Sequence, residues 1–315
     1  MRGERVLRNE HLASTPLCYR PGMLVATPSR LDETGAEELL NRIARLTGVP
    51  DAIDCSGMRF ADPYGVLVLL AVGLSAPYRR GRAWGLILPL DPAVLSWLDR
   101  CGARGLIEKL FIVDGPPAAD GTNRRDSGRD PVLLEVALVR EGADVHRAVS
   151  RIKARADLLL VSRLGYSGLA ADRFTVAMAE VCQNVVDHSG GPGLALAQCY
   201  LRAGGGPEIR LAVADVGIGV RASLAPRYED RLPGSWDDRA AVRLAFQLGV
   251  TASGDPDRGL GLAAVADMVR AWGGTLRLRS GTAACEVGAH PGERGGLAPF
   301  PGTQVNITLP HADRQ

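Results

Sequence analysis

Residues 179–190, AEVCQNVVDHSG, are the stretch from which the fold of this chain can be worked out. Residues three and four positions apart lie one above another on a helix. Glu180, Asn184 and Asp187 therefore share one helical face. A core-facing apolar stripe lies on a different arc and consists of Phe174, Met178, Val181 and Val185. Taken alone, this pattern is equally typical of an ordinary amphipathic surface helix, so motifs elsewhere must decide.

Length and composition limit the classes of protein to consider. A chain of 315 residues suggests roughly two domains, and 46% hydrophobic with 23% charged residues is ordinary for a soluble globular protein. The net charge of +2 favours neither nucleic acid nor an anionic membrane as a partner, and no apolar run approaches the ~20 residues that span a bilayer.

The cysteines and the N-terminus favour a cytoplasmic protein. The six cysteines form no C-x-x-C pair, so they are expected to be reduced thiols rather than metal ligands or a redox motif. The first residues, MRGERVLRNEHL, lack the apolar segment of a secretory signal.

The first part of the chain alternates between strand and helix patterns. We expect an irregular lead-in over residues 1–20 and an α/β domain over residues 21–114, with helices packed on a sheet. Its expected strands are 23–26, 52–54, 84–90 and 112–113, and its expected helices are 32–46, 66–74 and 92–101, followed by a short helix or turn over 105–111.

A linker and a second domain follow. Residues 115–131, GPPAADGTNRRDSGRDP, contain almost no apolar side chain and cannot bury a core. We expect the second domain to span 132–315. Its expected strands are 132–139, 194–201, 209–214, 275–279 and 304–309, and its expected helices are 144–160, the helix that carries Glu180, 236–248 and 263–272.

Two glycine motifs in the second domain point to a ligand. Asp215 ends a strand and is followed by Gly217 and Gly219, which would let the backbone approach a ligand closely, although a tight turn has the same pattern. Gly259 and Gly261 open a helix, where free backbone N–H groups and the helix dipole favour a phosphate. The charged, proline-containing stretch 220–258 between the motifs is expected to form a lid.

Taken in order, these motifs resemble a known family. E-x-x-x-N on a helix, D-x-G-x-G after a strand, G-L-G-L before a helix and G-T before a last strand resemble the GHKL (Bergerat) ATP-binding fold over about 132–309. That fold occurs in gyrase-type ATPases, histidine kinases and anti-sigma-factor serine kinases, and the NVVDHSG ending is most similar to the last group. The resemblance implies an α/β sandwich in which a mixed sheet is covered by helices on one face.

The resemblance also implies ATP and Mg²⁺ as cofactors and assigns roles around them. Asn184 would offer its carboxamide oxygen to Mg²⁺, which prefers oxygen ligands. Glu180 would orient or deprotonate the attacking water or hydroxyl. Asp215 would accept a hydrogen bond from the adenine amino group, and Gly217 and Gly219 would let the loop pass under the base.

The remaining implied roles concern the phosphates and the rim of the site. Gly259, Leu260 and Gly261 would hold the phosphates, and Thr303 would support the adenine contact from the last strand. Arg258 would add charge near the γ-phosphate, or would be an ordinary exposed lid arginine. Asp187 and His188 would flank the site, and we expect a structural hydrogen bond rather than a catalytic role for His188.

The first domain resembles a different family. Over roughly 21–114, the succession of elements around DCSGMRFADPYG is similar to a STAS domain, the fold of anti-sigma-factor antagonists. The phosphorylated loop of that family reads Asp-Ser-Ser-Gly, whereas Asp62, Pro63, Tyr64 and Gly65 stand here. Without the serine, the resemblance implies a docking or sensing module; a packing domain without a ligand is the alternative.

Two functions follow from the resemblances. The first is an ATPase or protein serine/threonine kinase in partner-switching signalling, and the second is a non-catalytic switch in which ATP orders the lid. The expected partner is a regulatory protein, STAS-containing or related to sigma factors, and a homodimer is also consistent with the family. Histidine autophosphorylation is not expected, because the sequence around His146 is not that of a histidine-kinase phosphoacceptor.

Overall fold

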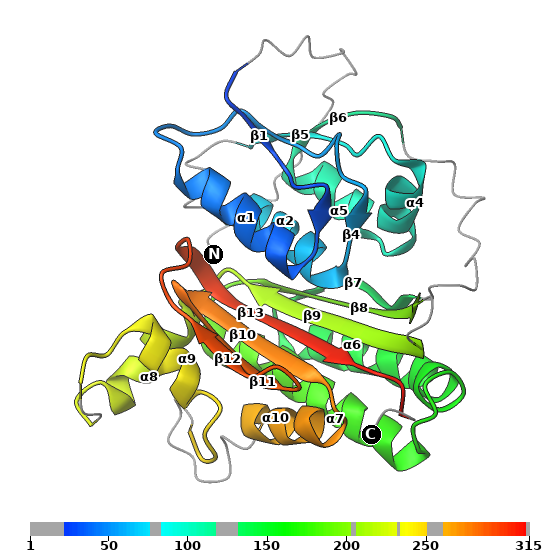
Figure 1. The fold of residues 1–315 in the computed structure, drawn as a ribbon, viewed down its shortest axis with the longest axis vertical. Coiled ribbons are helices and arrows are strands. Elements are labelled where there is room, and N and C mark those ends of the chain that lie inside the picture. The colour runs from blue at the N-terminus through cyan, green and yellow to red at the C-terminus, as the bar shows by residue number, and fades with distance from the viewer. Residues whose placement is uncertain are drawn as a thin grey trace, which may run out of the picture.

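The computed structural model describes residues 22–75, 83–117, 132–202, 206–231, 234–250 and 261–312. Two large sheets are built from separate parts of the chain, and a two-stranded sheet accompanies the first (Figure 1). We call residues 22–117 the N-terminal unit and residues 132–312 the C-terminal unit. The predicted lead-in over 1–20 and most of the predicted linker lie outside the described residues.

The N-terminal unit is an α/β layer structure with a parallel four-stranded sheet in the order β1-β3-β5-β6. Its helix α2 is apolar on every side and almost wholly buried, with Asp62 as the N-cap and Pro63 at its first position. A short parallel pair, β2 and β4, was not predicted. The bounds are β1 Leu24–Ala26, β2 Arg30–Leu31, α1 Glu33–Ala44, β3 Ala52–Asp54, β4 Phe60–Ala61, α2 Pro63–Leu74, β5 Gly85–Ile87, α4 Pro92–Arg100, α5 Ala103–Leu110 and β6 Ile112–Asp114.

The C-terminal unit contains a seven-stranded sheet in the order β12-β11-β10-β13-β9-β8-β7. Its first elements are β7 Val132–Val139, α6 Gly142–Ala156, a π-helical turn η2 Asp157–Val161, α7 Gly168–Asn184, a second π-helical turn η3 Val185–Ser189, β8 Gly193–Arg202 and β9 Gly206–Asp215. The later elements are α8 Gly219–Tyr228, α9 Asp238–Leu244, α10 Gly261–Ala271, β10 Thr275–Gly281, β11 Ala283–Gly288, β12 Gly292–Arg294 and β13 Phe300–Leu309.

The prediction that this sheet mixes parallel and antiparallel strands is wrong, because every adjacent pair of its strands is antiparallel. Strands β9 and β10 are separated along the chain by helices, but β13 returns between them and pairs antiparallel with both. Strands β9 and β10 therefore run parallel to each other, as a helical crossover requires, but they are not adjacent in the sheet.

The strands at the centre of this sheet bury side chains on both faces. Along β8, Ala195, Ala197 and Cys199 belong to one buried cluster together with α6, α7 and α10, whereas Leu194 and Leu196 belong to a second cluster together with α2. Successive side chains of a strand point to opposite faces, so these two sets mark the two sides of the sheet. A near-continuous apolar run such as LALA is typical of a strand buried on both sides.

The prediction that helices cover one face of the sheet is incomplete, since the N-terminal unit covers the other face. Helices α1 and α2 lie along the sheet on the side opposite α6, α7 and α10 (Figure 1). Polar contacts supplement the apolar ones: Arg210 on β9 donates to Asp62 at 2.9 Å, and the Trp97 indole of α4 donates to Gln198 on β8. The core is thus continuous from one unit to the other.

The predicted lid, 220–258, contains more helix than expected. Helix α8 begins at Gly219 and holds Pro226 within its last turn, and α9 is shorter than the predicted helix 236–248. Leu224, Trp236, Ala241 and Leu244 form a small buried cluster between these helices. Tertiary burial therefore stabilises α8 although proline disfavours a helix interior. Residues 251–258 of the predicted lid lie outside the described part.

Most other predicted elements are confirmed within a few residues, but β11 and β12 were not predicted. No helix in the described ranges has both the length and the apolar character needed to cross a membrane.

Candidate functional site

A cavity of about 580 Å³ lies between α7 and the sheet of the C-terminal unit. Residues from α7, η3, β9, α8, β10, β13 and the start of α10 line it. It therefore occupies the helix-covered side of the sheet and not the side covered by the N-terminal unit.

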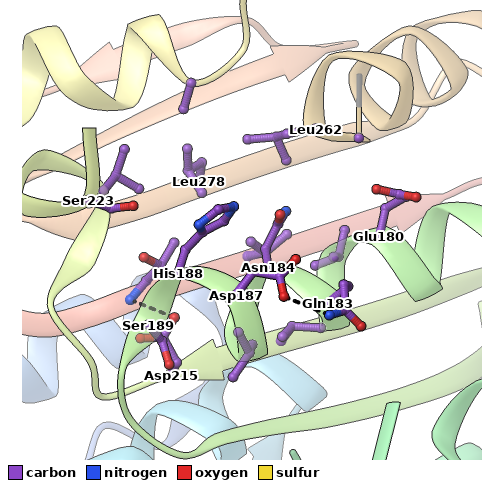
Figure 2. Close-up of a pocket in the computed structure, with 18 of the residues that line it drawn as sticks. Glu180, Gln183, Asn184, Asp187, His188, Ser189, Asp215, Ser223, Leu262 and Leu278 are labelled. Carbon is purple, nitrogen blue, oxygen red and sulfur yellow. Dashed lines mark hydrogen bonds between the residues drawn. The ribbon is translucent and has the colours of Figure 1, made fainter. Parts of the chain in front are cut away.

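Helix α7 provides one wall. Ser167 caps its N-terminus by accepting a hydrogen bond from the backbone N–H of Ala170 at 3.2 Å. Glu180, Asn184 and His188 project from successive turns toward the cavity, with Leu262 and Leu278 across from them (Figure 2). The helical spacing seen in the sequence is thus the geometry of one side of the site.

The end of this wall is a π-helical turn, η3, that follows Asn184 directly. A π-turn inserts an extra residue per turn, and such turns are common at functional sites. It brings Asp187, His188 and Ser189 together into the cavity lining. Asp187 accepts a hydrogen bond from Gln183 Nε2 at 2.8 Å. The structural hydrogen bond expected for His188 is not found, since no described residue bonds to its ring.

Asp215 lies on the opposite wall, at the end of β9, and only 5% of it is exposed. Its Oδ1 atom accepts a hydrogen bond from the backbone N–H of Gly217 at 2.8 Å, and its Oδ2 atom accepts one from the N–H of Thr303 at 3.2 Å. Burial raises the pKa of Asp215 to about 6, against the lowering effect of those two hydrogen bonds. A buried carboxylate that keeps acceptor capacity facing a cavity is suited to bind a ligand's N–H group.

Glycines permit the close approach of the chain segments around Asp215. A Cβ atom at Gly217 would lie 1.9 Å from the backbone oxygen of Ser189, although Gly217 itself does not line the cavity. Gly219, with φ of +76°, does line the cavity, and its backbone adopts a conformation that L side chains rarely adopt. The D-x-G-x-G motif therefore forms a tight loop beside the cavity, in which a side chain at Gly217 would clash and the backbone conformation of Gly219 favours glycine.

The start of α10 lies beside Glu180. A Cβ atom at Gly261 would be 2.5 Å from Glu180 Oε2, so the carboxylate lies against the first residue of that helix. Gly261 and Leu262 both line the cavity. Arg258, Gly259 and Leu260, the other residues predicted to contact the phosphates, lie outside the described residues.

Asn184, the residue predicted to hold Mg²⁺, is part of the cavity lining. Within the described ranges there is no group of three or more His, Cys, Asp or Glu side chains that could hold a metal. Asn184 offers a carboxamide oxygen to the cavity. Mg²⁺ in nucleotide sites takes few protein ligands and completes its octahedron with phosphates and water, so this donor set fits it.

Several lining residues were not predicted. The strands contribute an apolar floor, and α8 contributes three further side chains; these residues are Val213, Leu278, Val305, Val220, Ser223 and Leu224. Strand alternation could have identified the floor, because Val213 and Val305 lie two residues from Asp215 and Thr303 and so point to the same face. No sequence signal indicated the α8 residues, because α8 itself was not expected.

Comparison with known proteins agrees with this geometry. Residues 170–313 match a family of histidine kinase-, DNA gyrase B- and HSP90-like ATPases. The match begins near the start of α7 and ends after β13, so it includes the cavity and all the predicted site residues. No curated protein and no solved structure matches the chain.

Proposed function

We propose that this chain, whose C-terminal unit is an ATP-binding domain of the histidine kinase-like ATPase type, is a regulatory ATPase or protein serine/threonine kinase. The observation that carries the proposal is the position of Asp215, a nearly buried carboxylate across the cavity from Glu180 and Asn184. One wall of the cavity can bind a base, and the other can act on phosphates.

Adenine would bind at the Asp215 end of the cavity. The carboxylate would accept a hydrogen bond from the exocyclic amino group of adenine, a donor that guanine lacks at the same ring position. Val213, Leu278 and Val305 would contact the faces and edges of the base. Because Asp215 is held by two backbone N–H groups, its orientation is set before the ligand arrives.

The phosphates would lie toward α7 and the start of α10. Asn184 would hold Mg²⁺ through its carboxamide oxygen, and Mg²⁺ would neutralise the charge that develops on the phosphates. The N-terminus of α10 would offer backbone N–H groups to the same phosphates.

Glu180 would orient the nucleophile and accept its proton. It lies one turn before Asn184 and against Gly261, so its carboxylate is at the phosphate end of the cavity. A general base must lie within hydrogen-bond reach of the proton that it accepts. Water as the nucleophile gives hydrolysis, and a protein hydroxyl gives phosphoryl transfer.

The acceptor in a transfer reaction would be a separate protein. In the STAS-like interpretation of the N-terminal unit, Tyr64 stands near the place of the family's phosphorylated serine. Tyr64 is only 1% exposed, and α2 packs on the sheet face opposite the cavity. The N-terminal unit would instead dock or sense, and the partner would be a regulatory protein of the partner-switching class.

A non-catalytic switch is the second candidate, and the position of α8 favours it. Gly219, Val220 and Ser223 line the cavity from α8, which belongs to a small cluster with α9 that is distinct from the main core. A nucleotide would contact this cluster directly and could shift it without being hydrolysed.

Calorimetry with ATP and Mg²⁺ tests the proposal. The wild type and an Asp172→Asn control, altered at an exposed position on α7, should bind ATP equally. Asp215→Asn should weaken ATP and ADP binding alike, whereas Asn184→Ala should weaken ATP binding chiefly when Mg²⁺ is present. Absence of binding by the wild type would refute the ATP-binding function.

A further inference from the structure

A row of buried polar side chains lies on the sheet face opposite the cavity, directly behind Asp215. Arg277 and Arg279 on β10 are 1% and 0% exposed, and Gln304 on β13 is 0% exposed. All three point toward the N-terminal unit, since strand alternation places them opposite Leu276, Leu278 and Val305. Charged side chains are almost never fully buried unless they are paired.

Gln304 holds together the two backbone segments that orient Asp215. Its Nε2 atom donates to the backbone oxygen of Asp215 at 3.3 Å and to that of Pro301 at 2.9 Å. The first bond holds the end of β9, and the second holds the segment leading to Thr303, whose N–H binds the Asp215 carboxylate. The two donor hydrogens of one carboxamide thus connect both sides of the proposed adenine-binding element.

Arg279 determines how the Gln304 carboxamide is oriented. Its Nη1 atom donates to Gln304 Oε1 at 3.4 Å, which leaves Nε2 to face the two backbone oxygens. Its Nη2 atom donates to the backbone oxygen of Ala298 at 2.6 Å. The guanidinium therefore has a fixed place in this network.

The charge of Arg279 is balanced from the N-terminal unit. Glu37 on α1 accepts a hydrogen bond from Arg279 Nε at 2.8 Å and another from Arg277 Nη2 at 2.7 Å. Among the described residues, Glu37 is the one carboxylate paired with Arg279, whereas Arg277 also pairs with Glu33 and Glu286. Loss of the Glu37 charge would leave Arg279 as an uncompensated buried cation.

We infer that Glu37, Arg279 and Gln304 are positioning residues through which the N-terminal unit controls the affinity and base specificity of the nucleotide site. This inference rests on the proposed ATP-binding function. The chain of contacts runs from α1 through β10 and β13 to the backbone of Asp215, and none of its three side chains lines the cavity. By linkage, nucleotide binding would hold the N-terminal unit on the sheet by the same free energy.

Glu37→Gln tests the inference, because it keeps the shape of the side chain and removes its charge. ATP and ADP affinity should each fall about tenfold, which corresponds to about 1.4 kcal/mol and lies in the usual range for coupled sites. The preference for ATP over GTP should fall as well, because Asp215, whose orientation becomes less fixed, is the residue proposed to bind the adenine amino group.

Two matched controls lie on the same helix. Glu38→Gln changes the next residue, which is exposed and pairs with Arg42. Glu33→Gln weakens the same interface, but Glu33 bonds Arg277 and Asn306 and not Arg279. Both controls should keep ATP affinity and the ATP-over-GTP preference near the wild-type values, even where Glu33→Gln lowers thermal stability.

Gln304→Leu provides a second measure of the same path. It should weaken ATP binding more than Glu37→Gln, and the double variant should bind no worse than Gln304→Leu alone, since residues on one path are not additive. Thermal unfolding of each variant checks that the fold is retained.

The outcomes separate this inference from the proposed function. If the wild type and the Glu38→Gln control fail to bind ATP, the proposed function is wrong, and the inference falls with it. If they bind ATP but Glu37→Gln binds as they do, or Glu33→Gln loses as much affinity as Glu37→Gln, or the effects of Glu37→Gln and Gln304→Leu add, only the inference is overturned.

Discussion

Asp62 Oδ2 accepts a hydrogen bond from Arg210 Nη1 at 2.9 Å across the boundary between the two units, with 3% of the aspartate side chain and 17% of the arginine side chain exposed. The other oxygen of Asp62 accepts a hydrogen bond from Gly65 N at 2.9 Å and so caps α2. One carboxylate therefore both begins the helix that lies on the sheet and pairs with a strand of that sheet.

Replacement of the Asp62 carboxylate should lower the free energy of unfolding by more than the loss of a helix cap alone would. We expect Asp62→Ala to lower the free energy of unfolding by about 2–3 kcal/mol, because it removes both the helix cap and a charge-assisted hydrogen bond of Arg210, which keeps its ion pair with Glu208. Asp32 caps α1 in the same way but pairs with exposed Arg30, so Asp32→Ala should cost only about 1 kcal/mol. Chemical denaturation of both variants measures the difference, and equal losses would show that the ion pair adds nothing to the cap.

The pH dependence of stability should have an unusual sign at Asp62. Burial raises its pKa from 3.8 to about 6, against the lowering effects of the Gly65 N–H and Arg210. The folded protein then binds a proton more readily than the unfolded chain between these values, so stability falls as the pH rises from about 4 to about 6 and levels off above that. The difference in unfolding free energy between wild type and Asp62→Asn should follow this course.

Glu293 provides the control of opposite sign. Its hydrogen bond from Arg243 lowers its pKa from 4.5, so its contribution is present above that value and is lost as the pH falls through the folded pKa. The difference between wild type and Glu293→Gln should therefore shrink on acidification. If the differences in unfolding free energy for Asp62→Asn and Glu293→Gln changed with pH in the same direction, the assigned causes of the two pKa shifts would be contradicted.

Turnover should depend on Glu180 while nucleotide binding does not. We expect Glu180→Gln to lower phosphate release, or transfer to a partner, by at least about a hundredfold, the usual contribution of a positioned general base, with ATP affinity kept within a few fold. Phosphate release and calorimetry on the same preparations measure the two effects. Adding Gln183→Glu to Glu180→Gln places an acid in the cavity lining three residues from position 180 and shows whether a misplaced acid can substitute. Unchanged turnover would remove Glu180 from the mechanism and favour the non-catalytic switch.

Gly217 should tolerate no side chain. A Cβ atom there would lie 1.9 Å from the backbone oxygen of Ser189, so Gly217→Ala must displace η3 or the loop after Asp215. We expect lower stability together with weaker ATP binding. Gly168 at the start of α7 has open space around it, so Gly168→Ala should bind ATP normally and be stabilised by about 0.4–1 kcal/mol. Normal ATP binding by Gly217→Ala would show that the loop can shift without disturbing Asp215.

Sequence periodicity was sufficient for the elements that carry the site. The spacing of Glu180 and Asn184 placed them on one face of α7, and the D-x-G-x-G motif placed Asp215 at the end of β9; both lie in the cavity. These features are local, since helix and strand periods and the steric freedom of glycine act over a few residues. The order of the motifs along the chain was enough to indicate the family that residues 170–313 match.

Local patterns could not reveal the contacts between distant segments. Arg277 and Arg279 look like exposed positions of an alternating strand, yet they are buried against Glu33 and Glu37, about 240 residues earlier in the chain. The antiparallel insertion of β13, the helix α8 and the N-terminal unit on the second face of the sheet depend on the same kind of long-range packing. The sequence by itself determined most of the helices and strands and the glycine motifs beside the cavity, because those follow from interactions between near neighbours. Only the tertiary structure decided which faces meet, because the burial of apolar surface and the pairing of buried charges depend on the shape of the whole chain.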